Sequence, residues 1–406
     1  MRRKRTRLTP AFSDSRVRCG AWIGVSAAVL SATIAAARDA RSHFVPLVPA
    51  SYAGNEREPP DERHSPGKAH RDPPAPQISA TQRGDTLDVT VKSGVGPPNL
   101  QNLPACAFKP SREQRGVWRC RLIVRDLRAA VIDLVVTSGP SVVGYLQFRG
   151  TRSGLPDPSR PLTAGTVAHG TFDSRELGQP RGYDVYEPTR PGERPLPIVY
   201  VLDRGSYSQG LMAAIDLLIQ QRALPPLVVV ALDAGVRDLT GRDNLRAREM
   251  IAGLDADAHS AFEQFFFEEF LPSTQRMYNA SDDPRLVTII GASASASWVL
   301  DEANSQSFKA RNWGAFSVPS ENPVLKLPAK QAGRIAMGAG RLDAAYFATT
   351  ARICKAINAQ RGQCAFFAVQ GGHSQGVWDL LTTRLLTEEF DRPYRSPTLL
   401  PLPTER

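Results

Sequence analysis

From about residue 165 to residue 390, short apolar runs alternate with longer amphipathic segments. The runs are rich in Val, Ile and Leu, which is typical of strands buried on both faces of a sheet. The expected strands are 197–202, 227–232, 286–290, 334–337 and 364–369, and the expected helices include 211–221, 261–271, 344–360 and 377–390. An antiparallel pair precedes them, within residues 165–188. Because strand and helix alternate, the pattern predicts a mostly parallel sheet with helices on both faces.

A different pattern occupies residues 78–152, where short β-like runs are separated by turn-rich segments. The runs are 86–91, 116–124, 130–136 and 142–148. Such spacing is typical of a small all-β sandwich. This segment has no clustered His, Asp or Glu at a catalytic spacing, so its expected role is structural or in presenting substrate. We therefore expect two folded domains, a β-sandwich over 78–152 and an α/β domain over 153–392.

Two segments lack the apolar content of a folded domain. Residues 38–77 carry several prolines among scattered charges, which predicts a disordered linker. Residues 393–406 form a short Pro-rich tail. Neither segment is expected to contribute to a core.

The N-terminus begins with basic residues and continues into an uncharged apolar run over residues 20–37. A basic region, an apolar region and an Ala-rich end at Ala35-Ala36-Ala37 describe a secretory signal peptide over residues 1–37. The alternative is an uncleaved anchor that tethers the protein to the membrane through residues 20–37. Either interpretation places the folded part in the periplasm or outside the cell.

The net charge of +10 at first suggests an anionic partner. Residues 1–37 carry seven basic side chains and one acidic side chain, so six of the ten net charges lie in the presequence. The remainder has no basic stripe with interleaved aromatic residues, and we therefore exclude nucleic-acid binding. With 406 residues, 42% of them hydrophobic, the composition is that of an ordinary globular chain.

Cysteine usage agrees with export. After Cys19 the chain has four cysteines, and the natural pairs are Cys106 with Cys120 and Cys354 with Cys364, because each pair falls within one supersecondary unit. The alternative is a set of reduced, buried thiols. No Cys-x-x-Cys or Cys/His cluster suggests a structural metal.

The apolar run that ends near Ile290 leads through Gly291 into a helix-tolerant segment that reaches Leu300. Strand, sharp turn and helix, with Ser293 at the turn, is the geometry of a nucleophile elbow. The turn lifts the serine hydroxyl out of the sheet and points N–H groups of the helix start toward the reacting atom. The alternative is an ordinary Ala/Ser-rich turn, and the rest of the chain decides between the two.

Two further polar residues follow strands of the same predicted sheet. Asp343 lies beyond the run 334–337, and His373 lies beyond the run 364–369, after Gly371-Gly372. Because chemistry in such sheets occurs at the carboxyl ends of the strands, Ser293, Asp343 and His373 are expected to meet at one edge. A serine needs an imidazole to take its proton and a carboxylate to orient that imidazole. Asp343 has the alternative role of capping the helix that follows it.

The order Ser, Asp, His is that of α/β-hydrolases. Residues from about 160 to 390 resemble the esterase family of α/β-hydrolases that includes enterochelin esterases, feruloyl esterases, S-formylglutathione hydrolase and the secreted mycolyltransferases. The resemblance lies in the run 197–203, Arg246-x-x-Glu249-Met250, residues 262–272, Asp283-Pro284-Arg285 before Gly291-x-Ser293, and Gly371-Gly372-His373 with Trp378. The preceding β-sandwich also resembles the siderophore-esterase arrangement.

By this resemblance Ser293 would be the nucleophile, Asp343 the acid partner and His373 the base. The oxyanion hole would use the N–H of Ala294 and the loop that contains Arg204 and Gly205, and Arg246 and Trp378 would contact substrate. The chain departs from the family at Ser295, where glycine is usual, and in the loop Asp203-Arg204-Gly205, which is one residue longer than usual.

The sequence therefore predicts an exported serine esterase of the α/β-hydrolase fold that requires no metal and no organic cofactor. Its substrate would be a small-molecule, lipid or sugar ester. The β-sandwich favours a siderophore-type or other bulky ester, and a plant-polymer acyl ester is equally compatible with export. The alternatives are an acyltransferase that uses a sugar or lipid hydroxyl and a non-catalytic binding module.

Overall fold

The computed structural model describes residues 77–93, 97–100, 106–138, 141–157, 160–190, 195–206, 210–235, 244–305, 309–319, 334–360 and 362–389. These residues all belong to one compact unit of the chain. The predicted presequence 1–37 and tail 393–406 lie outside the described residues, as does the predicted linker except for residue 77. No helix in the described part of the chain is long and apolar enough to cross a membrane.

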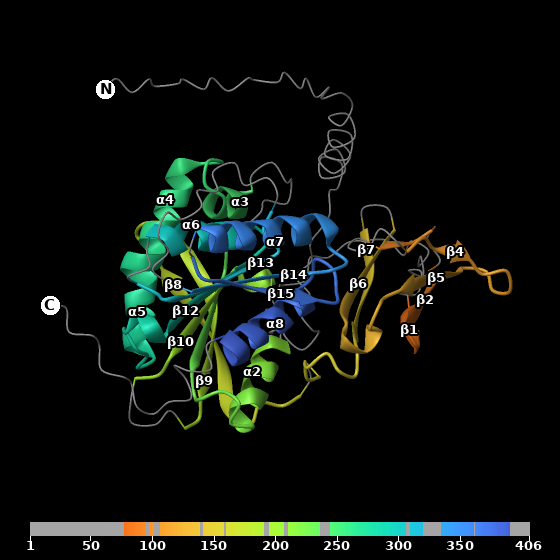
Figure 1. Ribbon diagram of the computed structural model, residues 1–406, viewed down its shortest axis with the longest axis horizontal. Helices are drawn as coiled ribbons and strands as arrows, with labels where there is room; N and C mark the ends of the chain where they lie inside the picture. Colours follow the sequence, from red (N-terminus) through yellow and green to blue (C-terminus); the bar gives the residue numbers. More distant parts are fainter. Residues whose placement is uncertain are drawn as a thin grey trace, which may run out of the picture. The chain divides into compact units, whose positions relative to one another are not determined.

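An eight-stranded sheet positions the candidate catalytic residues (Figure 1). Its strand order is β15-β14-β13-β12-β10-β11-β9-β8. Neighbours from β15 to β11 are parallel, and β9 and β8 continue the sheet as an antiparallel hairpin. The bounds are β8 Gly165–Asp173, β9 Pro180–Pro188, β10 Ile198–Leu202, β11 Val228–Leu232, β12 Val287–Ala292, β13 Asn312–Phe316, β14 Arg334–Gly340 and β15 Cys364–Val369. The predicted fold class is thus confirmed.

Alternate residues of the central strands enter two separate cores. In β10, Ile198 and Tyr200 pack on one face of the sheet, while Val199 and Val201 pack on the other. Side chains of a strand alternate between the two faces, so an unbroken apolar run is what a strand covered on both sides requires. The same alternation continues through β11 and β12.

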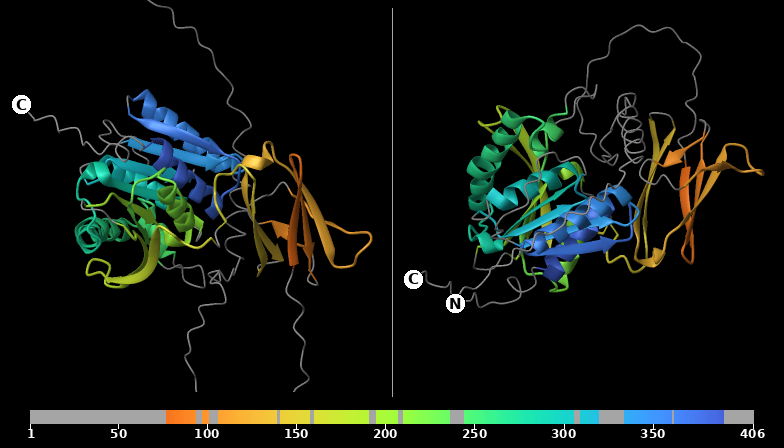
Figure 2. Two further views of the ribbon diagram at one scale, coloured as in Figure 1. Left: turned by 90° about the horizontal axis from the view of Figure 1, so that it is seen from below. Right: turned by 45° about the horizontal axis from the view of Figure 1, so that its top comes forward.

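Helices cover both faces of the sheet (Figures 1 and 2). One face carries α2 (Gly210–Gln220) and α8 (Gln375–Arg384), which pack against each other. The other face carries α4 (Ala256–Gln264), α5 (Leu271–Met277), α6 (Ala294–Ser305) and α7 (Ala344–Ala359). A short helix, α3 (Leu245–Met250), packs on α4 and α6.

A Phe-rich segment anchors the helix that follows the elbow. Helix α4 continues through a π-helical segment, Phe265–Phe270, directly into α5. Trp298 of α6 packs against two phenylalanine rings of this segment, with ring centroids 5.3 Å from Phe266, which lies edge-on, and 5.5 Å from Phe267, which is stacked. The indole is fully buried, so these contacts anchor α6 behind Ser293.

The strands β1 to β7, which we call the β domain, form two small sheets (Figure 2). One sheet has the order β1-β2-β5-β4 and the other β3-β6-β7. The bounds are β1 Gln77–Arg83, β2 Thr86–Lys92, β3 Asn99–Leu100, β4 Lys109–Pro110, β5 Val117–Ile123, β6 Val131–Ser138 and β7 Ser141–Arg149. Val89 of β2, Leu122 of β5 and Leu134 of β6 belong to one shared core, so the two sheets pack as a sandwich.

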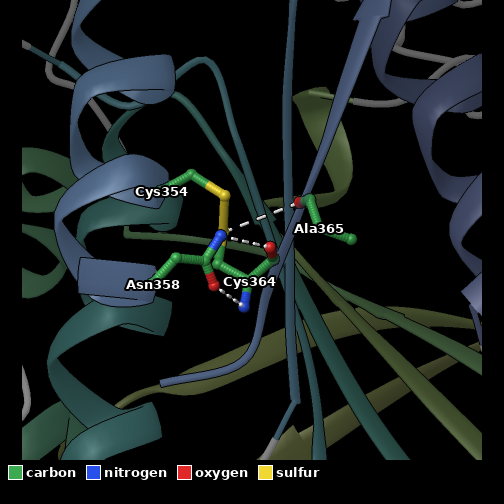
Figure 3. Close-up of a disulfide and its surroundings, with 4 residues drawn as sticks. All are labelled: Cys354, Asn358, Cys364 and Ala365. Atoms are coloured by element: carbon green, nitrogen blue, oxygen red, sulfur yellow. Dashed lines mark hydrogen bonds between the residues drawn. A yellow bond between two sulfur atoms is a disulfide. The ribbon is translucent and has the colours of Figure 1, made fainter. Parts of the chain in front are cut away.

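The four cysteines after the presequence form the two predicted pairs. Cys106 is bonded to Cys120 in the β domain, and Cys354 of α7 is bonded to Cys364 at the start of β15. Beside the second bond, the Asn358 side chain donates to the Cys364 carbonyl at 2.8 Å and accepts from the Cys364 N–H at 2.9 Å (Figure 3). These contacts fasten the end of α7 to the edge strand of the sheet.

Several elements were not expected from the sequence, among them β1, β3, β4, β13 and α3. Strand β13 is short and begins at Asn312, and it contains no β-branched residue. Helix α3 has only six residues, too few for an apolar period to be visible. The predicted helix 261–271 starts five residues earlier, because Asp255 accepts a hydrogen bond from the Ala258 N–H and caps a polar first turn.

Candidate active site

Ser293 lies in a strained turn between β12 and α6. Its φ of +57° is in the left-handed region, which non-glycine residues adopt rarely. The turn is held because the Ser293 N–H donates to the Phe316 carbonyl at 2.9 Å. A Cβ at Gly291 would meet the Ser295 carbonyl oxygen at 2.3 Å, so the close approach of strand and helix requires glycine there.

Ser295, which stands where glycine is usual, fits the turn without displacing it. Its buried hydroxyl donates to the Ala292 carbonyl at 2.8 Å and accepts from the Ala292 N–H at 2.9 Å. Both backbone groups of Ala292 are thereby satisfied at the end of β12. The departure from the family pattern therefore adds contacts that hold the turn.

His373 lies between the other two side chains. Its Nε2 is 3.1 Å from the Ser293 hydroxyl, and its Nδ1 is 2.8 Å from Oδ2 of Asp343. Asp343 occupies the N-cap position of α7, yet its side chain makes no capping hydrogen bond. Its carboxylate is directed at the imidazole instead, and it is only 10% exposed. Three residues from separate strand ends thus form one hydrogen-bonded relay.

Two aromatic rings pack against the imidazole. Trp378 lies edge-on to it with centroids 4.9 Å apart, and its indole N–H donates to the Ser317 hydroxyl at 3.1 Å. The Tyr346 ring also contacts the imidazole, with a centroid separation of 4.1 Å. Trp378 is buried and contacts His373, so its observed role is to support the imidazole. Contact of Trp378 with substrate stays a prediction.

Ion pairs hold the loop after β10 in place. Asp203 has a φ of +64°, and the carboxylate of Asp203 accepts from Nε of Arg246 at 2.5 Å. The Arg204 guanidinium binds Asp233 through two hydrogen bonds of 2.7 and 2.9 Å and also contacts Asp184 at 2.5 Å. Because its side chain is engaged in this way, Arg204 would serve an oxyanion through its backbone N–H.

Ala294 and Arg204 are the first residues of a helix and of a 3₁₀ turn, respectively. The first N–H groups of a helix have no acceptor within the helix, so these two are suited to a developing negative charge. The carbonyl of Gly205 accepts a hydrogen bond of 2.7 Å from the Gln375 side chain. Burial raises the pKa of Asp233, and the Arg204 guanidinium opposes that rise.

Gln375, which contacts Gly205, and Tyr346, which contacts His373, are not indicated by any sequence motif. Gln375 lies two positions after His373, in the segment 370–378, and Tyr346 lies three positions after Asp343. Proximity to the expected triad was the only signal for either, and polar or aromatic residues near helix starts are too common to be informative. Within the described ranges, no group of His, Cys, Asp or Glu has the arrangement of a metal site.

No known protein family and no curated protein matches the sequence. Solved structures do match. The enterobactin esterase of Shigella flexneri is 14% identical, with a TM-score of 0.57 over 79% of this chain and 96% of that protein. The ferric enterobactin esterase of Salmonella typhimurium is 15% identical, with a TM-score of 0.55 over 80% and 99%. A ferulic acid esterase of Anaeromyces mucronatus is 16% identical, with a TM-score of 0.45 over 58% and 96%.

The two enterobactin esterases match more of the chain than residues 160–389 can supply, so the likeness extends into the β domain. At these identities the likeness concerns the fold. This chain has the α/β-hydrolase fold that these esterases share. It has a central parallel sheet, helices on both faces of that sheet and a β domain before it.

Proposed function

We propose that the chain is a serine esterase in which Ser293 is the nucleophile, His373 the general base and Asp343 the residue that orients the base. The observation that carries the proposal is the relay from the Ser293 hydroxyl through the imidazole to the Asp343 carboxylate, with distances of 3.1 and 2.8 Å. The strained φ of Ser293 supports it, because strain of this kind persists where a reacting group must be exposed.

In the proposed reaction the Ser293 oxygen attacks the ester carbonyl while Nε2 of His373 takes the hydroxyl proton. The carbonyl oxygen becomes an oxyanion that the N–H groups of Ala294 and Arg204 stabilise. Collapse of this intermediate expels the alcohol, to which His373 returns the proton. Water then attacks the acyl-enzyme by the same route and releases the acid. Asp343 stays ionised and stabilises the imidazolium in both halves.

For the substrate we infer a bulky ester of a small molecule. The Shigella flexneri and Salmonella typhimurium structures, which match 79% and 80% of this chain, are both named as enterobactin esterases. The match includes the β domain. Hydrolysis of enterobactin, compared with that of a feruloyl ester and of a short p-nitrophenyl ester, ranks these classes by kcat/KM. A large preference for the short ester would contradict the bulky-substrate assignment. Transfer of the acyl group to an added alcohol in place of water would indicate an acyltransferase.

The activity is tested by replacing the nucleophile. Ser293→Ala should lower kcat for p-nitrophenyl ester hydrolysis by about 10³-fold or more, because the nucleophile and its proton are both lost. Ser260→Ala is the matched control, since the Ser260 hydroxyl accepts an exposed hydrogen bond from Gln264, one turn further along α4. Equal activity of Ser293→Ala and wild type would refute the proposal. Absence of turnover in wild-type protein over a broad ester panel would favour a binding module.

We infer further that the protein is exported. Two disulfides join the four cysteines of the folded part, and such bonds persist in oxidising compartments. The predicted signal segment 1–37 lies outside the described residues. N-terminal sequencing of the protein from the native host should place the first residue shortly after Ala37. Recovery of the intact chain with membranes would indicate the anchor instead, and reduced protein in the cytoplasm would contradict export.

A further inference from the structure

The loop that carries His373 rests on strand β6 of the β domain. Before the histidine, the Val131 N–H donates to the Gln370 carbonyl at 2.9 Å. A Cβ at Gly371 would lie 2.4 Å from the Val131 carbonyl oxygen, so the two backbones are in direct contact. Only glycine permits this approach. The start of the loop is therefore fixed to the β domain and not to its own sheet alone.

The other end of the loop is held by the same strand. Oδ2 of Asp133 accepts a hydrogen bond of 3.1 Å from the N–H of Gly376, in the first turn of α8. A Cβ at Gly376 would lie 2.5 Å from Cγ1 of Val131, so this contact is also close. Ser374 is the N-cap residue of α8, but its side chain makes no capping hydrogen bond. Asp133 thus caps α8 from another domain.

Side chains of β6 alternate between its two faces, which explains why two of its residues can reach the loop of His373. Ile132 and Leu134 point into the core of the β domain. Val131 and Asp133 are on the opposite face of the strand, and Val131 belongs to the core formed by α8 and the large sheet. A strand of this small sandwich that is buried on both faces must be covered by something outside the sandwich, and here α8 covers it.

Removing the Asp133 carboxylate from water by itself destabilises the fold. Its side chain is 4% exposed, and a buried carboxylate is stable only when its oxygens are hydrogen-bonded. Oδ1 accepts from the Gln147 side chain at 2.6 Å, while Oδ2 accepts from the helix N–H. A negative charge at a helix N-terminus interacts favourably with the helix dipole. The same first turn of α8 reaches the oxyanion loop through Gln375 and Gly205.

We propose that Asp133 is a positioning residue for His373, so that the β domain forms a working part of the catalytic apparatus. Asp133 touches neither substrate nor reacting atoms, and it acts by fixing the first turn of α8 and the loop 370–376 before it. This inference rests on the proposed esterase function. It predicts that weakening the contact displaces the imidazole from Ser293 and slows the chemical step.

The test compares Asp133→Ala, Asp133→Asn and Val89→Ala. Val89 is fully buried in the core of the β domain, so its truncation loosens that domain without touching the loop. Asn retains an oxygen that can accept the Gly376 N–H. For p-nitrophenyl acetate we expect Asp133→Ala to lower kcat by about 10- to 100-fold with KM little changed, and Asp133→Asn to retain most of kcat. Val89→Ala, compared well below its Tm, should leave kcat near wild type.

A second readout does not depend on catalysis. Amide hydrogen exchange in a peptide covering residues 370–378 should become faster in Asp133→Ala and remain near wild type in Val89→Ala. If exchange in this peptide and kcat are both unchanged in Asp133→Ala, or if Val89→Ala reproduces both effects, the positioning role is overturned. If wild-type protein hydrolyses no ester, the esterase proposal fails separately, and the exchange result still decides whether Asp133 holds the loop.

Discussion

The hydroxyl of Ser295 forms two hydrogen bonds with a single residue, Ala292, which immediately precedes the proposed nucleophile. Removing it leaves a buried N–H and a buried carbonyl without this partner. Ser295→Ala should therefore lower the free energy of unfolding by about 1–3 kcal/mol, as measured by urea denaturation. Ser295→Gly should cost more, because glycine also weakens the helix.

Ser297 of the same helix provides the matched control. Its side chain is buried too, but its hydroxyl has no hydrogen-bond partner among the residues that the structure describes. Ser297→Ala should consequently be neutral or stabilising, since it removes an unpaired polar group. A destabilisation of Ser295→Ala no larger than that of Ser297→Ala would show that the Ser295 hydroxyl does not hold the turn.

Glu302 of α6 introduces a pH dependence of stability. Burial, with a smaller contribution from the Glu263 charge, raises the pKa of Glu302 to about 8 from a usual value of 4.5. Below pH 4.5 the side chain is protonated in both the folded and the unfolded chain, so its titration does not change the free energy of unfolding. Between pH 4.5 and 8 only the unfolded chain releases the proton, and stability falls as pH rises through this window.

Glu302→Gln should abolish this loss, and the glutamine oxygen can still accept the hydrogen bond that the Ser305 hydroxyl donates at 2.8 Å. The Tm of the variant should equal that of wild type near pH 4.5 and exceed it increasingly up to pH 8. A constant difference in Tm over this range would mean that Glu302 does not titrate there.

At the scale of single residues, the meeting of Ser293, Asp343 and His373 could be predicted because each lies within four residues of the end of a strand. The positioning residues could not be predicted in this way. Asp133 and Gly376 are separated by more than 240 positions, and their contact arises from the packing of one domain on the other. A lone Asp in an apolar strand suggests an error in the strand assignment or a surface position, not a helix cap supplied from elsewhere.

Among the elements, α7 and β15 lie next to the proposed acid partner and the proposed base. Asp343 immediately precedes α7, and His373 lies four residues after β15 ends. The Cys354–Cys364 bond joins the same two elements far from the site. It therefore constrains how α7 and β15 pack, while the hydrogen bonds at the other end set the position of the imidazole.

Replacing Cys354 and Cys364 together by serine should lower the free energy of unfolding by about 2–3 kcal/mol, the range expected for a short closed loop. KM for a small ester should stay near the wild-type value, because the bond lies away from the relay. Urea denaturation under non-reducing conditions measures the first effect, and initial-rate kinetics measure the second. Asn358→Ala, which removes only the neighbouring amide contacts, should cost less. Unchanged stability of the double variant would contradict a structural role of the bond.

Element type was predictable where an apolar run was long and periodic. The runs at β10 and β11 are apolar throughout, the run at β12 is interrupted only by Thr288, and all three strands are predicted correctly. Strand β13 was missed because its sequence, Asn-Trp-Gly-Ala-Phe, lacks β-branched residues, and its place in the sheet comes from pairing with β12 and β14. Tertiary pairing of this kind overrides local propensity.

For the whole molecule, the structure links three parts that the sequence presents separately. The β domain holds the loop of His373, the aromatic segment around Phe266 packs against α6, and Gln375 joins the His373 loop to the loop after β10. The chain order Ser, Asp, His indicated the fold, and the resemblance indicated the chemistry. The positioning role proposed for the β domain could be inferred only from the contacts between β6 and the loop 370–376.

The central claim is that Ser293 is activated by His373, and covalent labelling tests it most directly. Wild-type protein treated with a fluorophosphonate and analysed by peptide mass spectrometry should carry the label on Ser293. Ser293→Ala should carry none, and His373→Ala should be labelled at least about 10³-fold more slowly, because the hydroxyl then lacks its base. Labelling of another residue in wild type, or of Ser293 at an unchanged rate in His373→Ala, would contradict the account.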